Sequence, residues 1–351
     1  MKKLDSEYEI HKLAAGLKVD WQQNAVQNII ALCHEKISKW TKGIFKIRSI
    51  QELEALVCEK VKLVFEEIYS EDDLNAVIRK YVGLGEPIFA TLKTDLDEKT
   101  FATLIERRRI DGNSHDRYVA VIDCRGNKVA RRFFTRWHEI AHLLTLQGQL
   151  QLPLHRSTTD RSPTERLMDT IAGEIGFYDP LFGPILRDEI AKEGGFTFAT
   201  AERVRNRFCP EASFQATLNA CVNRFDAPML LVEIGLGYKK EEERQMFSSQ
   251  TTLFSDERPK PRLRVSTTIG NERARGTSLK IHRNMQVPAA SMLYDFFFTE
   301  DDHPAKEAEG FENLNIWRHS DGGSLANIFV KIRVRRFENS VLALISLARP
   351  G

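Results

Sequence analysis

The chain has 351 residues, 42% of them hydrophobic and 28% charged, a balance typical of a folded protein with two or three domains. Lysine and arginine number 51 and aspartate and glutamate 49, so the net charge of +2 excludes a polycation that coats nucleic acid in bulk. No stretch approaches the ~18 consecutive apolar residues of a membrane span, and the N-terminus lacks the apolar segment of a signal peptide. The composition therefore predicts no membrane partner.

The five cysteines form an odd set without a CxxC pair. This pattern argues against a disulfide scaffold and against a cysteine-rich structural zinc site. We expect reduced thiols, most of them buried, and a cytoplasmic location.

The first part of the chain, from residue 8 to about 80, predicts helices. Ile10, Leu13 and Leu17 recur at helical spacing, and the same spacing continues among the apolar residues of 26–33 and 53–64. Charged residues fill the remaining positions, which is typical of helices that pack on a neighbouring domain.

Between 87 and 135 the pattern changes to short strands. We expect strands over 87–92, 118–123 and 130–135, with a turn at 125–128 where Gly126 and Asn127 give a permissive backbone. The strand over 118–123 is open to two interpretations. It is either a sheet edge on which an extended substrate adds, or an internal strand.

Helices and strands are expected in turn over the rest of the chain. One helix begins near Thr135 and continues through Leu146, and a second begins with the capping sequence Ser162-Pro163-Thr164-Glu165 and continues to about Gly176. Residues 196–235 predict two or three short helices. The last third predicts strands over 262–269, 328–334 and 341–347.

The sequence His138-Glu139-Ile140-Ala141-His142 carries the chemistry. Histidines four apart on a helix project from one face, a geometry that suits two imidazole nitrogens binding one zinc ion. Glu139 points away from that axis and can act as a base toward a water molecule, as in the HExxH zincin pattern. The surrounding helix is apolar, so two histidines and a glutamate would be costly to bury there without a partner.

A catalytic zinc ion needs a third protein ligand. Glu165, Asp169 and Glu174 on the following helix are candidates. Glu165 has a competing local role, since it can close a capping box with Ser162. Asp169 can instead hold a ligand histidine in its metal-binding tautomer, or it is an ordinary solvated acid.

The motif residues resemble a known family. Arg132-Phe-Phe-Thr135, His138-Glu-Ile-Ala-His142 and Glu165-Arg-Leu-Met-Asp169-Thr-Ile-Ala172 are similar to the RFT, HExxH and ExxAN motifs of the ImmA/IrrE metallopeptidases. The resemblance covers about 85–180 and extends more weakly to the C-terminus. Asp169 stands where the family has Asn, and Met168 replaces the Ala before it.

The resemblance implies one zinc ion held by His138, His142 and Glu165, with Glu139 as the catalytic base. It implies a peptidase that cuts a helix-turn-helix repressor in response to stress or DNA damage. It also implies a helix-turn-helix-like middle segment and a GAF-like sensor at the end of the chain, with single-stranded DNA or a small molecule as activator.

Two further groups of residues are candidates for functional roles. His155, Tyr178 and His115 are candidates for stabilising an oxyanion. In the last third, Arg262 and Arg264 alternate with apolar residues, as do Lys331, Arg333 and Arg335. If these strands share a sheet, the basic rows either merge into a nucleic-acid face or remain a solvated face that blunts strand edges.

We therefore predict an α+β protein with four regions: helices over 1–84, a zincin-like catalytic domain over 85–192, a helical segment over 193–245 and a β-rich sensor over 246–351. The predicted function is zinc-dependent cleavage of a repressor. The alternative is a non-enzymatic, zinc-containing DNA-binding regulator or antitoxin-like partner.

Overall fold

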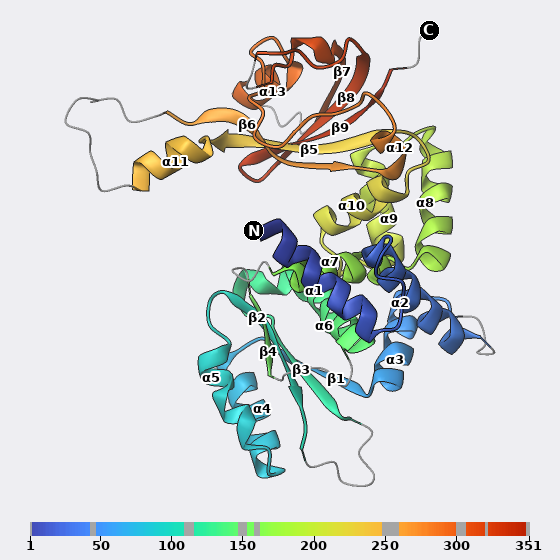
Figure 1. Ribbon diagram of the computed structural model, residues 1–351, viewed down its shortest axis with the longest axis vertical. Coiled ribbons are helices and arrows are strands. Elements are labelled where there is room, and N and C mark those ends of the chain that lie inside the picture. Colours follow the sequence, from blue (N-terminus) through green and yellow to red (C-terminus); the bar gives the residue numbers. More distant parts are fainter. Residues whose placement is uncertain are drawn as a thin grey trace. The chain divides into compact units, whose positions relative to one another are not determined.

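The computed structural model of the chain (Figure 1) describes residues 2–42, 47–108, 116–146, 153–157, 162–247, 260–299, 307–319 and 322–348. The chain divides into two compact units, Met1–Gly194 with Glu202–Thr217, and Gly195–Ala201 with Leu218–Gly351. The architecture is α+β, as the sequence predicts, with a mixed four-stranded sheet in the first unit and an antiparallel five-stranded sheet in the second. Among the described helices, none is long and apolar enough to cross a membrane.

The N-terminal helices follow the predicted periodicity. They are α1 (Lys2–Gly16), α2 (Ala25–Thr41), α3 (Ile50–Val61) and α4 (Glu71–Gly83). Ser49 and Ser70 cap α3 and α4 by accepting a hydrogen bond from the backbone three residues on. The prediction of continuous helix up to residue 80 is wrong at β1 (Leu63–Ile68), because Lys62 takes a left-handed conformation that ends α3.

The sheet of the first unit contains β1, β2 (Thr100–Glu106), β3 (Tyr118–Asp123) and β4 (Leu154–Ser157), in the order β1-β3-β2-β4. β3 runs parallel to β1 and antiparallel to β2, and β4 is antiparallel to β2. β3 is therefore the internal strand of the two alternatives, which explains why all six of its residues are buried. The two outer strands of this sheet, among those described, are β1 and β4.

Two other expected strands are helical. Residues 87–92 form the 3₁₀ turn η1 (Pro87–Thr91) and the start of α5 (Leu92–Asp95), with Pro87 at the first position. Phe89 and Leu92 are three residues apart, and both lie in the core cluster with β1 and β3. Residues 130–135 belong to η2 (Gly126–Arg131) and to α6 (Arg132–Leu146), which begins three residues before the predicted start.

Helices cover both faces of this sheet (Figure 1). On one face, Ile105, Val119 and Val121 pack with apolar side chains of α4, η1 and α5. On the other face lies α6, which carries the two motif histidines and packs against β3, β2 and α7 (Pro163–Gly176). The motif helix is thus held between the sheet and α7.

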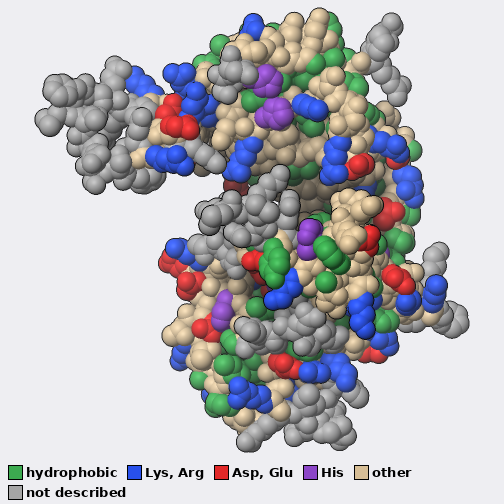
Figure 2. All heavy atoms as spheres, viewed as in Figure 1, with side chains coloured by type: hydrophobic (Ala, Val, Ile, Leu, Met, Phe, Trp, Pro, Cys, Tyr) green, Lys and Arg blue, Asp and Glu red, His purple; other side chains and the backbone are tan. Residues whose placement is uncertain are grey.

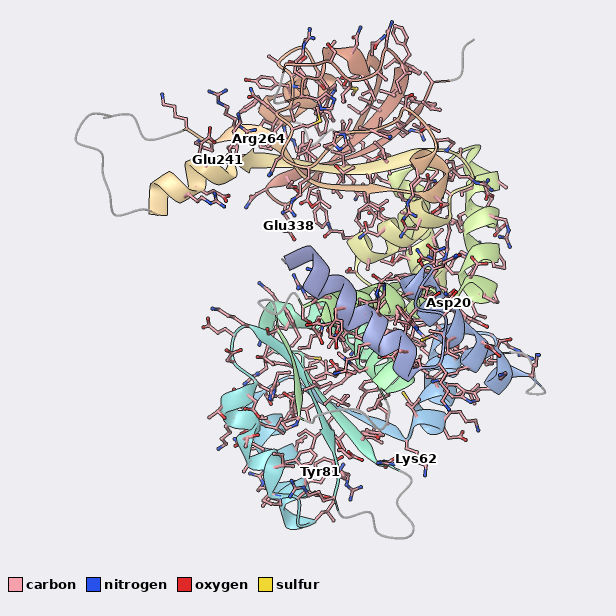
Figure 3. All side chains as sticks on the ribbon, viewed as in Figure 1. Asp20, Lys62, Tyr81, Glu241, Arg264 and Glu338 are labelled. Carbon is pink, nitrogen blue, oxygen red and sulfur yellow. The ribbon has the colours of Figure 1, made fainter. Side chains whose placement is uncertain are left out.

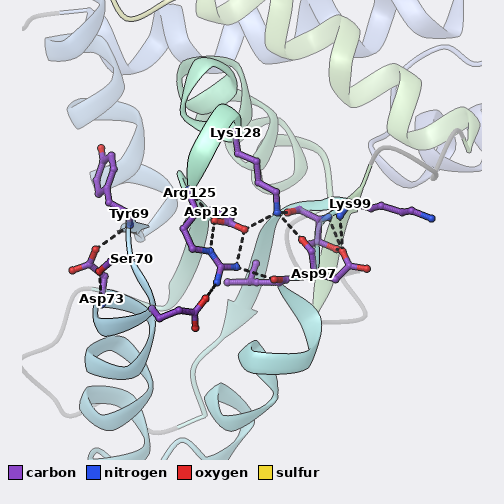
Figure 4. Close-up of polar contacts among 11 residues, drawn as sticks. Tyr69, Ser70, Asp73, Asp97, Lys99, Asp123, Arg125 and Lys128 are labelled. Atoms are coloured by element: carbon purple, nitrogen blue, oxygen red, sulfur yellow. Dashed lines mark hydrogen bonds and ion pairs between the residues drawn. The ribbon is translucent and has the colours of Figure 1, made fainter.

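A buried carboxylate fixes the connection from β3 to α6 (Figure 4). Asp123 accepts hydrogen bonds from Arg125 Nε at 2.8 Å and Nη2 at 2.9 Å, and from Lys128 Nζ at 2.7 Å. The same cations donate to the backbone carbonyl of Leu96, which precedes β2, and to that of Thr100, the first residue of β2. This network ties the end of β3 to the start of β2 and to the turn that leads into the motif helix.

The middle of the chain contains α8 (Asp179–Glu193), α9 (Phe198–Phe208) and α10 (Phe214–Arg224), close to the predicted short helices. Arg203 and Arg207 of α9 form ion pairs with Asp188 and Glu189 of α8. These two arginines are therefore neutralised within the protein. The prediction that helices continue to 235 is wrong, because Met229–Gly237 is strand β5.

The C-terminal sheet has the order β6-β5-β9-β8-β7 and is fully antiparallel. Its strands are β5, β6 (Arg262–Gly270), β7 (Glu307–Asn313), β8 (Phe329–Phe337) and β9 (Ser340–Leu347), with α11 (Lys240–Phe247), α12 (Glu272–Arg275), α13 (Met292–Phe298) and η3 (Leu314–Ile316) between them. Alternate apolar side chains of β5, β6, β8 and β9 join one core cluster with Trp317 and Leu293. The three strands predicted in this region are confirmed.

Candidate metal centre

The two motif histidines and Glu165 come together in the structure. Nε2 of His138 lies 3.0 Å from a carboxylate oxygen of Glu165 and 3.1 Å from Nε2 of His142, which lies 3.3 Å from the other oxygen of Glu165. One ligand atom from each residue lies within 4.8 Å of the others. Four ligands placed tetrahedrally at ~2.0–2.1 Å from zinc lie about 3.3 Å apart. The observed separations fit that geometry.

The protonation pattern at His138 indicates what this group of atoms can bind. Oδ1 of Asp169 lies 2.8 Å from Nδ1 of His138, and a carboxylate there favours the tautomer with its proton on Nδ1. Nε2 of His138 faces the carboxylate of Glu165, so these two atoms need either a proton or a metal ion between them. The donor set of two imidazoles and one carboxylate suits zinc.

Electrostatics at the ligands agree with a cation site. Burial by itself lowers the pKa of His138, but its hydrogen bonds with Asp169 and Glu165 outweigh that effect and hold the pKa above its ordinary value. Burial raises the pKa of Glu165, and the contacts with His138 and His142 overcome it and hold this pKa well below the usual range. The carboxylate is therefore ionised where the imidazole nitrogens meet it.

The local sequence explains how Glu165 reaches the histidines. Ser162 caps α7 by accepting a hydrogen bond from the backbone N–H of Glu165 at 3.1 Å, and Pro163 starts the helix. The carboxylate of Glu165 contacts both histidines, with one oxygen near each Nε2. Apolar residues on the buried side of α7, including Leu167, Met168 and Ile171, orient that helix against α6.

Glu139 is buried beside the triad, with 1% of its surface exposed. Its Oε1 has no hydrogen-bond partner among the described residues. Its charge acts on both His138 and Arg156. A carboxylate oxygen that receives no hydrogen bond from the described residues is available to accept a proton.

The structure adds Arg156, which sequence reasoning missed. This residue of β4 pairs with Ala102 of β2, whereas its neighbour His155 pairs with Thr103, so the two side chains lie on opposite faces of the sheet. Arg156 lies on the face of α6, where Nη2 is 3.3 Å from Oδ1 of Asp169 and the guanidinium lies over the ring of Phe134. Its buried Nη1 has no partner among the described residues.

Burial lowers the pKa of the Arg156 guanidinium, and the charges of Asp169, Glu139 and Glu165 act against that lowering. The alternation of Leu154, His155 and Arg156 was the one sequence signal for this placement. Without a flanking apolar run, it was too short to identify as a strand.

Two of the three predicted oxyanion candidates, His155 and Tyr178, lie elsewhere. His155 is exposed, and its Nδ1 is 3.2 Å from the hydroxyl of Thr103 on the face away from α6. The ring of Tyr178 stacks on His34 of α2, and its hydroxyl bonds to Thr41. His115 falls outside the described residues.

The basic residues of the C-terminal sheet do not form one continuous row. β6, with Arg262 and Arg264, is separated from β8 by β5 and β9. On β8, Lys331 and Arg333 pair with Glu309, and Arg335 pairs with Glu307. The predicted merging of the two rows is therefore wrong, because two strands lie between them and glutamates of β7 neutralise the row on β8.

No protein family matches this chain, and no curated protein does. The likeness to ImmA/IrrE peptidases thus rests on the motif residues themselves. Of these, His138, His142 and Glu165 form a group able to hold a metal ion.

Proposed function

We propose that this chain is a cytoplasmic, zinc-dependent endopeptidase with a zincin-like catalytic domain. One observation carries the proposal: two imidazole nitrogens and a carboxylate oxygen meet within 4.8 Å on adjacent helices, next to a buried glutamate. The substrate, a helix-turn-helix repressor cleaved in response to stress or DNA damage, is proposed from the motif resemblance.

The residues divide the chemistry of hydrolysis among them. Zinc held by His138, His142 and Glu165 would supply a Lewis acid and lower the pKa of water to ~7. Glu139 takes a proton from the attacking water, whose oxygen bonds to the scissile carbonyl carbon. When the C–N bond breaks, Glu139 delivers the proton to the leaving nitrogen.

We propose that Arg156 stabilises the negative charge that develops on the carbonyl oxygen. Its guanidinium is held by Asp169 and Phe134, while Nη1 keeps a donor that no described residue accepts. Fixed donors aimed at a developing oxyanion are among the strongest catalytic contributions. β4 ends the sheet, so an extended substrate can add to this strand beside Arg156.

The test uses the 351-residue chain and, as substrate, the helix-turn-helix repressor that the motif resemblance leads us to expect beside its gene. Wild type should carry about one zinc per chain by elemental analysis and cut the repressor at one position, seen by mass spectrometry. Glu139→Gln should keep zinc and lose cleavage by at least about 100-fold. Glu165→Gln should lose zinc, whereas the control Glu174→Gln, on the same helix, should keep both zinc and activity.

Two results would count against the proposal. Cleavage by Glu139→Gln at the wild-type rate would remove the glutamate from the chemistry, and a protein isolated without chelators and lacking zinc would remove the metal. Zinc without cleavage, together with a promoter-fragment gel shift that Glu139→Gln leaves unchanged, would favour a non-enzymatic regulator.

A further inference from the structure

A cavity of about 770 Å³ lies within the C-terminal unit. It is formed by β6, by the segment 282–288 that pairs with the outer edge of β6, and by residues 316–319 after η3. The start of α11 contributes Lys239 and Glu241. A volume of roughly 300–1,000 Å³ is typical of sites for small molecules.

The charge of the cavity lining is strongly positive. Lys239, Arg264, Arg283 and Arg318 line the cavity, and among the lining residues that the structure describes Glu241 is the one carboxylate. His282 and His319 also line it, with ring centroids 5.7 Å apart. Figure 2 shows histidine and Lys/Arg side chains gathered on this unit. A lining with this excess of cations favours an anionic ligand.

Arg264 is the unusual member of the set. It is only 4% exposed, and Figure 3 shows it on β6 close to Glu241 of α11. Nη1 donates to the backbone carbonyl of Asn284 at 3.1 Å. Buried Nε and Nη2 have no hydrogen-bond partner among the described residues. A buried cation with unsatisfied donors is costly unless an anion meets it.

Nε and Nη2 of Arg125 show what such a pair of donors binds. In Arg125, Nε and Nη2 donate side by side to the two carboxylate oxygens of Asp123, at 2.8 and 2.9 Å. This edge of a guanidinium matches two oxygens of a carboxylate or a phosphate. Arg264 presents the same edge, and no carboxylate of the described part of the chain receives it.

We propose that this cavity binds a small phosphate-bearing molecule, with two phosphate oxygens on Nε and Nη2 of Arg264. Four cations against one carboxylate favour a multiply charged phosphate over a single carboxylate. Ile316, Val287 and Met285 provide apolar surface for an organic part of the ligand. This site is separate from the metal centre and does not depend on peptidase activity.

Isothermal titration calorimetry of the full-length protein tests the proposal, with pyrophosphate and inorganic phosphate as probes and ionic strength held constant with chloride. Pyrophosphate should bind with a stoichiometry of one. Arg264→Lys keeps the charge but loses the paired donors, so it should weaken binding at least about tenfold. Arg283→Ala should also weaken binding, whereas Arg273→Ala, an exposed arginine of α12 outside the cavity, should not.

Circular dichroism checks the fold of each variant, and Arg283→Ala carries the test if Arg264→Lys does not fold. The four ribonucleoside monophosphates form a second arm, because tighter binding than inorganic phosphate would show that the apolar surface holds an organic part. No binding of pyrophosphate, or equal binding by wild type and the folded variants, would overturn the proposal. The proposal would also be overturned if a single-stranded oligonucleotide displaced bound pyrophosphate and mononucleotides at the same nucleotide concentration did not.

Discussion

At the scale of single residues, Arg156 joins the strand at the end of the sheet to the metal centre. Its Nη2 contacts Asp169, and its guanidinium lies over Phe134, so the side chain is held without using its buried Nη1. Arg156→Met should reduce kcat for repressor cleavage by about 100-fold or more, the cost of losing one oxyanion donor. Zinc content should be unchanged.

His155→Ala is the matched control for Arg156→Met, since His155 is the next residue of the same strand and faces away from α6. It should cleave at close to the wild-type rate. A reversed result, with His155→Ala inactive and Arg156→Met active, would assign the oxyanion role to the histidine.

Asp169 contacts His138, one of the candidate metal ligands. Its Oδ1 accepts the Nδ1–H of His138 at 2.8 Å, and removal of such a partner typically costs 10–100-fold in metal affinity. Asp169→Ala should therefore weaken zinc binding by about that factor in a competition titration with a chelator. Asp169→Asn should cost less, because an amide oxygen still accepts this hydrogen bond. The exposed neighbour Thr170→Ala should leave the affinity unchanged.

At the scale of elements, Asp123 holds together the segments that place α6. Its side chain is fully buried, and two cations donate to it. Asp123→Asn removes the buried carboxylate that Arg125 and Lys128 share, although Arg125 keeps its ion pair with Glu71, and should lower the free energy of unfolding by about 3 kcal/mol in a urea titration. The control Asp72→Asn, an exposed acid in the first turn of α4, should change it by less than about 0.5 kcal/mol.

The same carboxylate predicts a dependence of stability on pH. Burial raises the pKa of Asp123, but the hydrogen bonds from Arg125 and Lys128 outweigh it, so the pKa in the folded state lies below the ordinary 3.8. Its stabilisation is complete above the unfolded-state pKa and is lost as the pH falls through the folded-state pKa. The difference between wild type and Asp123→Asn should therefore shrink on acidification below about pH 4. A constant difference would contradict this assignment.

Local sequence patterns predicted some elements well and others poorly. The capping sequence at Ser162 and the alternation in β6, β8 and β9 are complete within a few residues, and these predictions are confirmed. β1 was missed because its partner β3 lies more than 50 residues later, and nothing local distinguishes so short an apolar run from a helix. Residues 87–92 and 130–135 were mistaken for strands because each segment has too few apolar residues to fix a period.

The candidate metal centre shows the same contrast between residues that a local pattern predicts and residues that distant contacts bring together. His138 and His142 share a helix, so their spacing alone predicted that they face one site. The contact between α6 and α7 had to bring Glu165 to them, and only the motif resemblance favoured it over Asp169 and Glu174. The position of the Arg156 side chain on the face of α6 depends on the pairing register of β4 with β2, which no local sequence pattern predicts.

At the scale of the whole molecule, the two compact units carry two separate proposed sites. A ligand present at 100 times its Kd stabilises the folded state by about 2.7 kcal/mol. For units of this size, that raises Tm by about 5–10 °C. In calorimetry of the full chain, zinc should raise the transition of the first unit and pyrophosphate that of the second.

Two variants serve as controls, since Glu165→Gln should abolish only the zinc shift and Arg264→Lys only the pyrophosphate shift. A single transition that both ligands shift equally would show that the units unfold together, contrary to the expectation from their separate cores.

The position of β4 at the end of its sheet has a consequence for where a repressor would be cut. A polypeptide that lengthens a sheet must offer its own N–H and C=O groups, and in a helix these are already bonded to each other. A compact bundle of recognition helices offers few such groups. Scission is therefore expected in the linker or tail of the repressor, and proteins with unrelated residues there would be cut equally well if that stretch is extended.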